Sequence, residues 1–237
     1  MFSQRIITKE GTSMYKKCIK RCFDIIGALT IIIFFWWVFA IIAILVRINL
    51  GSPVIFKQDR PGLGGKVFKL YKFRSMLDAR DENGELLPDA KRMTKFGKLL
   101  RASSMDELPE VWNILKGDMS FVGPRPWTVH YLKFFTEEEH RRHEVRPGLT
   151  GLAQVNGRTT ANWDERLKYD ITYVNNLSLW MDIKVLFMTV KKVFSRADIV
   201  EAGCQGNFDD FRKKQWEEGI VEKPSWYKPE EKDKVND

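Results

Sequence analysis

The stretch that decides the fold is residues 25–46, IIGALTIIIFFWWVFAIIAILV, which contains no charged residue. As an α-helix it would be about 33 Å long, against a hydrocarbon core of about 30 Å in a typical bilayer. It is too long for the apolar region of a signal peptide, and the following Arg47-Ile48-Asn49-Leu50 offers no small-residue cleavage site. We therefore expect a membrane anchor that is retained.

Positive charge lies on both sides of this anchor. Residues 1–22 carry a net charge of +5, and residues 47–105 hold thirteen basic residues against six acidic ones. Because basic flanks favour the cytoplasmic side, a helix that enters the bilayer and returns on the same face satisfies both flanks. A single spanning helix with a basic far side is the alternative, and charge alone does not decide between them.

Composition excludes several classes of protein. The 237 residues have a mean hydropathy of −0.31, which excludes a polytopic membrane protein, and 13% aromatic residues exclude extended disorder. Cys18, Cys22 and Cys204 have no metal-ligand spacing, so reduced thiols are expected. Acylation of Cys18 and Cys22, beside the anchor, is a weaker alternative.

Outside the anchor the pattern predicts a mainly helical fold with one small β-hairpin. Two β-rich runs, Val54–Gln58 and Lys66–Lys72, surround the Pro/Gly-rich turn at residues 60–65. Helices are expected at Lys91–Leu100, Glu107–Leu115, Thr128–Glu144, Trp163–Asn175 and Leu179–Phe194.

The last of these segments alternates apolar and basic residues at helical spacing. This pattern fits an amphipathic helix in the membrane interface, and an ordinary core helix fits equally well. The predicted organisation is a basic juxtamembrane segment (1–22), a membrane helix (23–47), a small globular domain (48–200) and a charged C-terminal extension (201–237). Residues 222–237 resemble a soluble tail.

The adjacent carboxylates Asp106 and Glu107 are the strongest candidates for chemistry. An ordinary explanation exists, because acids at a helix start favour the macrodipole and Ser104-x-x-Glu107 fits a capping box. The functional alternative is that one carboxylate attacks a phosphorus atom while its neighbour holds a metal ion.

Basic residues elsewhere favour the functional alternative. Arg125 lies between Pro124 and Pro126, which restrict the backbone and suit a pre-organised guanidinium for a phosphate. Further positive charge comes from Lys72, Arg74, Arg101 and Arg158. Asp118 and Asp170 are carboxylates that could help to hold a divalent cation. Together these residues predict a site for a doubly charged phosphate ester.

Other motifs point to chemistry less specifically. His140-x-x-His143 could be half of a metal site, but an exposed helical face is the simpler interpretation because no third ligand stands at a telling distance. Gly62-Leu-Gly-Gly65 lacks the Lys-Ser/Thr of a P-loop. No nucleic-acid-binding motif is present, so no nucleic-acid partner is expected.

Several longer motifs, in order, resemble one family. They are Lys20-Arg-Cys-Phe-Asp24, Pro53-Val-Ile-Phe-Lys-Gln58, Arg60-Pro-Gly62, Tyr71-Lys-Phe-Arg-Ser-Met76, Arg101 to Asn113, Gly117-Asp-Met-Ser-Phe-Val-Gly-Pro-Arg-Pro126, Arg146-Pro-Gly-Leu-Thr-Gly151 and Gln154-Val-Asn-Gly-Arg158. From about Tyr15 to Phe194 the chain is similar to the bacterial sugar transferases, the monotopic polyprenyl-phosphate phosphoglycosyl transferases, in their short single-domain form.

The resemblance implies a reaction and its residues. Sugar 1-phosphate would pass from a UDP-sugar to undecaprenyl phosphate, with release of UMP, as the first membrane step of capsule, exopolysaccharide or glycoconjugate synthesis. Asp106 would be the nucleophile that forms a phosphosugar-enzyme intermediate, and Glu107 would bind Mg²⁺. Lys72, Arg101 and Arg125 would bind phosphate, and Arg158 and Asp170 would also contribute to substrate binding. A homo-oligomer and downstream glycosyltransferases are further candidate partners.

The resemblance also implies a location, with one departure. Family members work at the cytoplasmic face of the bacterial inner membrane on a re-entrant helix that a Ser-Pro pair breaks. Here Trp36-Trp37 stand at those positions, and residues 23–47 contain no proline. We still expect re-entry because both flanks are basic. The alternative function is a non-catalytic, membrane-anchored basic scaffold that binds anionic lipid or an envelope-assembly partner.

Overall fold

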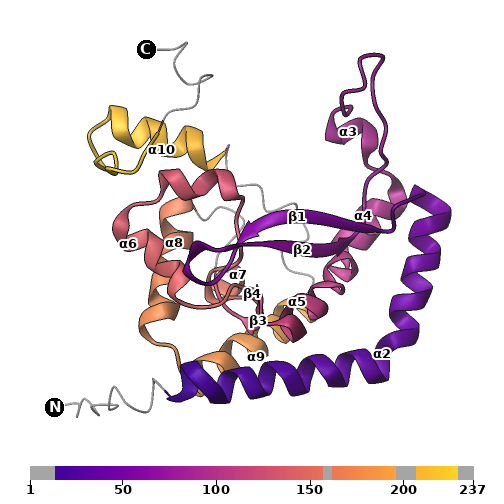
Figure 1. The fold of residues 1–237 in the computed structure, drawn as a ribbon, viewed down its shortest axis with the longest axis horizontal. Coiled ribbons are helices and arrows are strands. Elements are labelled where there is room, and N and C mark those ends of the chain that lie inside the picture. The colour runs from indigo at the N-terminus through magenta and orange to yellow at the C-terminus, as the bar shows by residue number, and fades with distance from the viewer. Residues whose placement is uncertain (1–13, 157–161, 196–206, 229–237) are drawn as a thin grey trace.

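The computed structural model describes residues 14–156, 162–195 and 207–228, and it is mainly helical, as predicted. Figure 1 shows a long N-terminal helix along two sides of a body built from short helices and a hairpin. The helices are η1 (Tyr15–Ile19), α2 (Lys20–Leu50), η2 (Leu63–Gly65), α3 (Asp89–Arg92), α4 (Lys95–Ala102), η3 (Met105–Glu107), α5 (Glu110–Lys116), η4 (Val129–Phe134), α6 (Glu137–His140), η5 (Arg141–Glu144), α7 (Leu152–Asn156), α8 (Trp163–Asn175), α9 (Leu179–Ser195) and α10 (Phe208–Glu217).

Helix α2 contains the predicted anchor. Within the described residues it is the one helix long and apolar enough to cross a membrane, and most of its apolar side chains are exposed instead of packed in the body. It contacts the body near both ends, through Asp24 and Ala28 at one end and Val46 and Leu50 at the other. A straight helix of this length would carry one end away from the domain.

The helix instead bends sharply along its course, so that its two halves border two sides of the body (Figure 1). No proline lies in the bend. Between the two packed ends, the indole Nε1 of Trp37 donates a hydrogen bond of 3.1 Å to the carbonyl oxygen of Phe34.

The predicted hairpin is confirmed. Strands β1 (Ile55–Pro61) and β2 (Val67–Phe73) pair antiparallel from Ile55↔Phe73 to Pro61↔Val67. The turn contains Gly64 and Gly65 at φ of 64° and 75°, a region that favours glycine. The hairpin lies on α5, and Leu70 and Phe73 join the hydrophobic clusters beneath α2.

A second, smaller sheet was not predicted. Strands β3 (Ser120–Val122) and β4 (Gly148–Thr150) are parallel and only three residues long. Gly123 follows β3 at a close backbone approach, because a Cβ atom there would lie 2.4 Å from the carbonyl oxygen of Arg146. This contact brings the loop with Arg125 against the segment that precedes β4.

The predicted helices differ in how well they match. Trp163–Asn175 corresponds to α8 and Leu179–Phe194 to α9, whereas the predicted helix at Lys91–Leu100 is split into α3 and α4. The predicted long helix at Thr128–Glu144 is wrong, since it is broken into η4, α6 and η5. Phe134 and Phe135, fully buried at the first break, pack in an aromatic cluster that a continuous helix would disrupt.

Helix α9 is amphipathic in the structure. Val185 and Asp182 are buried, whereas Trp180 and Phe187 are 75% and 71% exposed. The buried side is tied to α2, because Lys20 Nζ lies 2.5 Å from Asp182 Oδ2. Figure 1 shows α9 beside the first half of α2, so the exposed apolar side chains of both helices border the same part of the molecule.

Helix α10 belongs to the charged C-terminal extension, where no helix was predicted. Its Phe208 is fully buried among Phe134, Phe135 and Leu167. Tyr227, in the segment that resembled a soluble tail, packs against the same cluster. The described part of the extension is therefore integral to the fold and lies on the side of the body away from α2 (Figure 1).

Candidate active site

The two candidate carboxylates lie in the tight connection between α4 and α5. Ser104 there adopts a left-handed conformation (φ 54°), and a single 3₁₀ turn, Met105–Glu107, follows it. The expected helix start at Glu107 is wrong, because α5 begins at Glu110. The capping-box explanation is also wrong: Ser104 makes no side-chain cap, and the Glu107 carboxylate is bonded to basic residues.

Glu107 lies between two cations from distant parts of the chain. Lys72 Nζ on β2 donates to Glu107 Oε1 at 2.7 Å, and the Arg125 guanidinium contacts both carboxylate oxygens. Burial alone would raise the pKa of Glu107, but the charges and hydrogen bonds of Arg125 and Lys72 lower it to about 2. Glu107 is therefore ionised at every physiological pH.

Asp106 has a different environment from its neighbour. It is 8% exposed, and none of the described residues donates a hydrogen bond to its carboxylate. Burial raises its pKa above the usual value, the charge of Lys72 opposes this shift, and the nearby negative charge of Glu107 adds to it. A carboxylate without hydrogen-bond donors, held among cations, retains its lone pairs for attack on an electrophile.

A third carboxylate, Glu110, was missed from the sequence. It is 2% exposed, and its Oε1 lies 3.2 Å from Lys72 Nζ, so Lys72 bridges Glu107 and Glu110. Burial is the main cause that raises the pKa of Glu110 to about 7, against the opposing charge of Lys72. The three-residue spacing from Glu107 was the available signal.

Arg125 is held through both its side chain and its backbone. Its side chain pairs with Glu107, and its backbone carbonyl accepts a hydrogen bond of 2.8 Å from Arg142 Nη2. Arg142 also donates to Asp170 Oδ2 through Nε (3.1 Å) and Nη2 (2.7 Å), and both side chains are almost completely buried. Asp170 is therefore engaged with Arg142, a residue that the sequence did not single out.

The remaining predicted site residues have distinct surroundings. Arg101 donates from Nε to Ser75 Oγ (2.9 Å), and its charge lowers the pKa of Asp106. Asp118 pairs with Lys116 at 3.2 Å and accepts from the Asn113 side chain. Arg158 lies outside the described residues.

Arg60 was quoted only as part of a motif, yet its environment is unusual. Its guanidinium donates to Gln58 Oε1 at 2.7 Å, while its buried Nε has no hydrogen-bond partner in the described structure. Burial lowers the pKa of Arg60, and so does the neighbouring charge of Arg125. Two neighbouring guanidinium groups, one without a carboxylate partner in the described structure, suit an anion.

The carboxylates present fit a magnesium ion that is completed by substrate. The described residues contain no group of three or more His, Cys, Asp or Glu side chains placed to hold a metal. Mg²⁺ commonly binds through one or two carboxylates, with phosphate oxygens and water as its other ligands. Glu107, as a single carboxylate, meets that requirement.

The histidine pair does not lie on the exposed helical face that the sequence suggested, because the predicted helix breaks after His140 and His143 is buried. His143 Nδ1 lies 3.2 Å from the carbonyl oxygen of His140, and burial lowers the pKa of His143 to about 3. Cys18 and Cys22 are exposed free thiols, and Cys204 lies outside the described residues.

An apolar groove of about 730 Å³ lies between the second half of α2, the hairpin and α5. Its lining is mostly aromatic and aliphatic, and it includes Pro109, which directly precedes α5, and Trp112. Lys57 and Lys116 lie at 6.0 and 5.3 Å from the centroid of the Tyr71 ring in the same groove. The lining residues are Phe39, Ala40, Ala43, Ile55, Lys57, Tyr71, Phe73, Pro109, Trp112 and Lys116.

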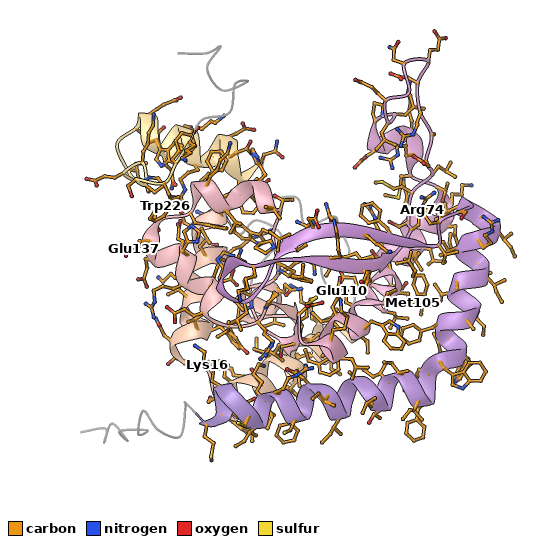
Figure 2. The ribbon with its side chains drawn as sticks, in the orientation of Figure 1. Lys16, Arg74, Met105, Glu110, Glu137 and Trp226 are labelled. Carbon is orange, nitrogen blue, oxygen red and sulfur yellow. The ribbon has the colours of Figure 1, made fainter. Side chains whose placement is uncertain are left out.

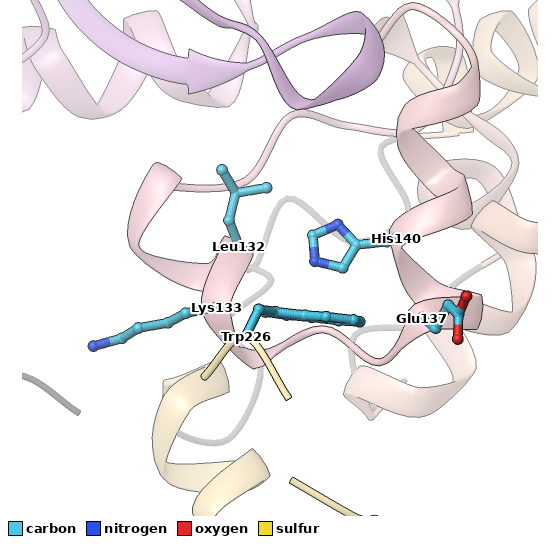
Figure 3. A pocket seen from close by; sticks show the side chains of 5 residues that line it. All are labelled: Leu132, Lys133, Glu137, His140 and Trp226. Carbon is cyan, nitrogen blue, oxygen red and sulfur yellow. The ribbon is translucent and has the colours of Figure 1, made fainter. Parts of the chain in front are cut away.

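A second pocket, of about 560 Å³, lies far from the carboxylates. Figure 3 shows the side chains that line it, namely Leu132, Lys133, Glu137, His140 and Trp226. In Figure 2, Glu137 and Trp226 lie on the opposite side of the hairpin from Met105 and Glu110. This pocket is therefore separate from the candidate active site.

Comparison with known proteins identifies relatives over most of the chain. The family model for bacterial sugar transferases matches residues 15–196. An uncharacterized sugar transferase, EpsL, of Bacillus subtilis is 50% identical over 175 residues, covering 74% of this chain and 87% of EpsL.

Two relatives carry named activities. The UDP-glucose:undecaprenyl-phosphate glucose-1-phosphate transferase of Klebsiella pneumoniae is 40% identical over 190 residues, and an N-acetylgalactosaminephosphotransferase of Aeromonas hydrophila that uses undecaprenyl phosphate is 37% identical over 185 residues. These matches cover 74% and 75% of this chain but only 40% and 44% of the relatives. With its family model matched over residues 15–196, the chain belongs to the bacterial sugar transferase family.

Proposed function

We propose that this transferase moves sugar 1-phosphate from a UDP-sugar to undecaprenyl phosphate through a covalent intermediate on Asp106. The observation that carries the proposal is the unequal environment of the two adjacent carboxylates. Glu107 is fixed by Lys72 and Arg125, whereas the buried Asp106 carboxylate has no hydrogen-bond donor among the described residues. The named relatives catalyse transfers of this kind.

The first half of the reaction needs no general base. An Asp106 carboxylate oxygen attacks the phosphorus that bears the sugar, and the bond from that phosphorus to the bridging oxygen breaks. UMP leaves with that oxygen and its electron pair. Lys72, Arg125 and Arg101 offset negative charge around the phosphorus, and Arg60 is suited to the other phosphate of the donor. Arg158 remains a predicted phosphate ligand.

In the second half, the acceptor displaces the enzyme. A phosphate oxygen of undecaprenyl phosphate attacks the same phosphorus, the bond to Asp106 breaks, and the carboxylate is regenerated as the diphosphate forms. The nucleotide part of the donor has already left as UMP, while its sugar phosphate remains on Asp106. Donor and acceptor therefore need not occupy the site together.

Glu107 is the residue that would hold Mg²⁺ at this site. When bound, the ion would polarise phosphate oxygens and neutralise charge. In the structure Glu107 is already paired with two cations, so its carboxylate is ionised and oriented before any ligand binds.

The groove beside α2 is suited to the acceptor's isoprenoid chain. Its apolar lining comes from α2, the hairpin and α5, and Lys57 and Lys116 add positive charge for a phosphate. Pro109 and Trp112 in its wall lie close in sequence to Asp106 and Glu107. This arrangement supports entry of the acceptor from the side of the membrane helix.

The membrane arrangement follows from α2 and α9. We propose that α2 enters and leaves the cytoplasmic leaflet of the bacterial inner membrane and that the exposed apolar side of α9 lies in the interface. The bend of α2, the contacts of both its ends with one body and the basic flanks on both sides support this arrangement.

The direct test of the function is UMP release from UDP-sugars in the presence of Mg²⁺ and undecaprenyl phosphate. We expect Asp106→Asn to abolish release, and Asp59→Asn, on the exposed part of the hairpin, to retain it. Undiminished release by Asp106→Asn would remove Asp106 as nucleophile. A panel of UDP-glucose, UDP-galactose and N-acetylated UDP-hexoses identifies the sugar, which family membership leaves open.

A further inference from the structure

Helix α10 lies beyond residues 15–196, which the family model matches, but it is tightly joined to the body. Its Arg212 is fully buried and pairs with Glu139 at 2.5 Å. Gln215 donates to Asp164 at the start of α8 (2.8 Å). These polar contacts join α10 to α6 and α8, and Figure 1 shows α10 above these two helices.

The first residue of α10 packs on the segment that follows Arg125. The fully buried Phe208 ring lies 5.3 Å from the ring of Trp127, centroid to centroid. Trp127 also contacts Trp163 at 4.8 Å and Phe135 at 5.5 Å. Trp127 is two residues from Arg125, so α10 packs on a residue of the same loop.

Trp127 in turn contacts the guanidinium that holds the loop. The central carbon of the Arg142 guanidinium lies 4.2 Å from the Trp127 ring centroid, within the range of a cation–π interaction. The same guanidinium donates to the Arg125 carbonyl and to Asp170. One buried side chain therefore joins the aromatic cluster under α10 to the backbone of a residue that contacts Glu107.

We propose that α10 is a positioning element of the active site, acting through Phe208, Trp127 and Arg142 to hold the Arg125 guanidinium against Glu107. The prolines on either side of Arg125 restrict its backbone, and the Arg142 hydrogen bond fixes its carbonyl. Without the packing of Phe208, Trp127 and Arg142 lose a fixed surface, and the distance between Arg125 and Glu107 is no longer set. The catalytic consequence rests on the proposed function, whereas the coupling between α10 and Arg125 does not.

The test is a double-mutant cycle in the full-length chain. Phe208→Leu keeps an apolar side chain but loses the aromatic ring that packs on Trp127. Arg142→Lys keeps the charge but loses the planar guanidinium that donates to both Asp170 and the Arg125 carbonyl. We expect each to lower kcat/KM for the UDP-sugar about tenfold and to cause no further loss in the Arg125→Ala background. Glu217→Ala, exposed on α10, is the matched control and should retain wild-type kinetics.

A purely structural role for α10 gives a different result. It predicts equal fold-losses in the wild-type and Arg125→Ala backgrounds, and that result would overturn the proposal, as would unchanged kinetics in both single variants. The same cycle measured by thermal unfolding needs no substrate. If Phe208→Leu and Arg125→Ala are non-additive in stability but the wild type releases no UMP, the proposed function fails and the coupling stands.

Discussion

Asp106 and Glu107 are neighbours in sequence with opposite surroundings. Lys72 and Arg125 lower the pKa of Glu107 to about 2, whereas burial raises the pKa of Asp106. The difference arises because only one of the two carboxylates has hydrogen-bond donors from the described chain. Such a division allows one group to organise charge while the other reacts.

Lys72 interacts with all three carboxylates of the candidate site, so its loss should affect each of them. It bonds Glu107, lies 3.2 Å from Glu110 and lowers the pKa of Asp106 by its charge. We expect Lys72→Met to reduce kcat by about 10²–10³-fold, the range for removal of one pre-organised charge stabiliser. The exposed Lys98→Met on α4 is the control, and a loss of less than about threefold for Lys72→Met contradicts the assignment.

Glu110 predicts a pH dependence. Below about pH 7 its carboxyl is neutral and Lys72 serves Glu107 and the donor phosphate. As the pH rises through 7, the new carboxylate attracts Lys72 and repels the donor, so kcat/KM for the UDP-sugar should fall between pH 6 and 8. Glu110→Gln removes this fall. Glu138→Gln, an exposed matched change, should keep it, and an unchanged fall in Glu110→Gln would assign it to another group.

The same pKa shift affects stability. A carboxyl whose pKa is raised by folding binds more protons in the native state than in the unfolded state. Glu110 therefore lowers the free energy of unfolding as the pH rises from about 4.5 to about 7, and Glu110→Gln should flatten the dependence of the melting temperature on pH in that window. An unchanged slope in Glu110→Gln would contradict this assignment.

At the level of elements, the groove between α2, the hairpin and α5, proposed as the acceptor site, can be tested by measuring the two halves of the reaction separately. Trp112→Ala removes an indole ring from the lining of this groove. We expect the KM for undecaprenyl phosphate to rise about tenfold while UMP release in the absence of acceptor is unchanged, because the donor does not use the groove. Trp226→Ala, in the separate pocket of Figure 3, is the matched control. Equal effects on both halves would argue against the groove as acceptor site.

Local sequence patterns predicted the hairpin and two helices, because these elements form from residues that are close in sequence. Two β-rich runs around a Pro/Gly-rich turn identified the hairpin, and helical patterns identified α8 and α9. The site depends on partners that no local pattern pairs: Lys72 and Glu107 are 35 residues apart, and Arg142 and Asp170 are 28 apart. Helix α10 was missed because charged residues dominate its short sequence, although Phe208, Phe211 and Trp216 pack on the aromatic cluster.

The whole molecule combines a bent anchor with a body that contacts both of its ends. The uncharged apolar run predicted a membrane segment and the basic flanks predicted re-entry, but residues 23–47 lack the proline that would have located a bend. In the proposed function the basic excess around the anchor also supplies charge for the phosphates, since Lys72, Arg101 and Arg60 come from the same region.

Topology can be tested in intact cells. In a background with Cys18, Cys22 and Cys204 replaced by serine, Ser3→Cys and Ser225→Cys should both be protected from a membrane-impermeant maleimide and react after permeabilisation. Re-entry puts both positions on the cytoplasmic side. Labelling of either position before permeabilisation contradicts this topology.

The most direct test of the central claim is intact-mass measurement after incubation with Mg²⁺ and the UDP-sugar alone. The account predicts stoichiometric UMP release and a mass increase of one sugar phosphate, mapped to the peptide with Asp106 and absent from Asp106→Asn. Addition of undecaprenyl phosphate should remove the adduct. Turnover with no adduct at any time, or an adduct on another residue, would contradict Asp106 as the nucleophile.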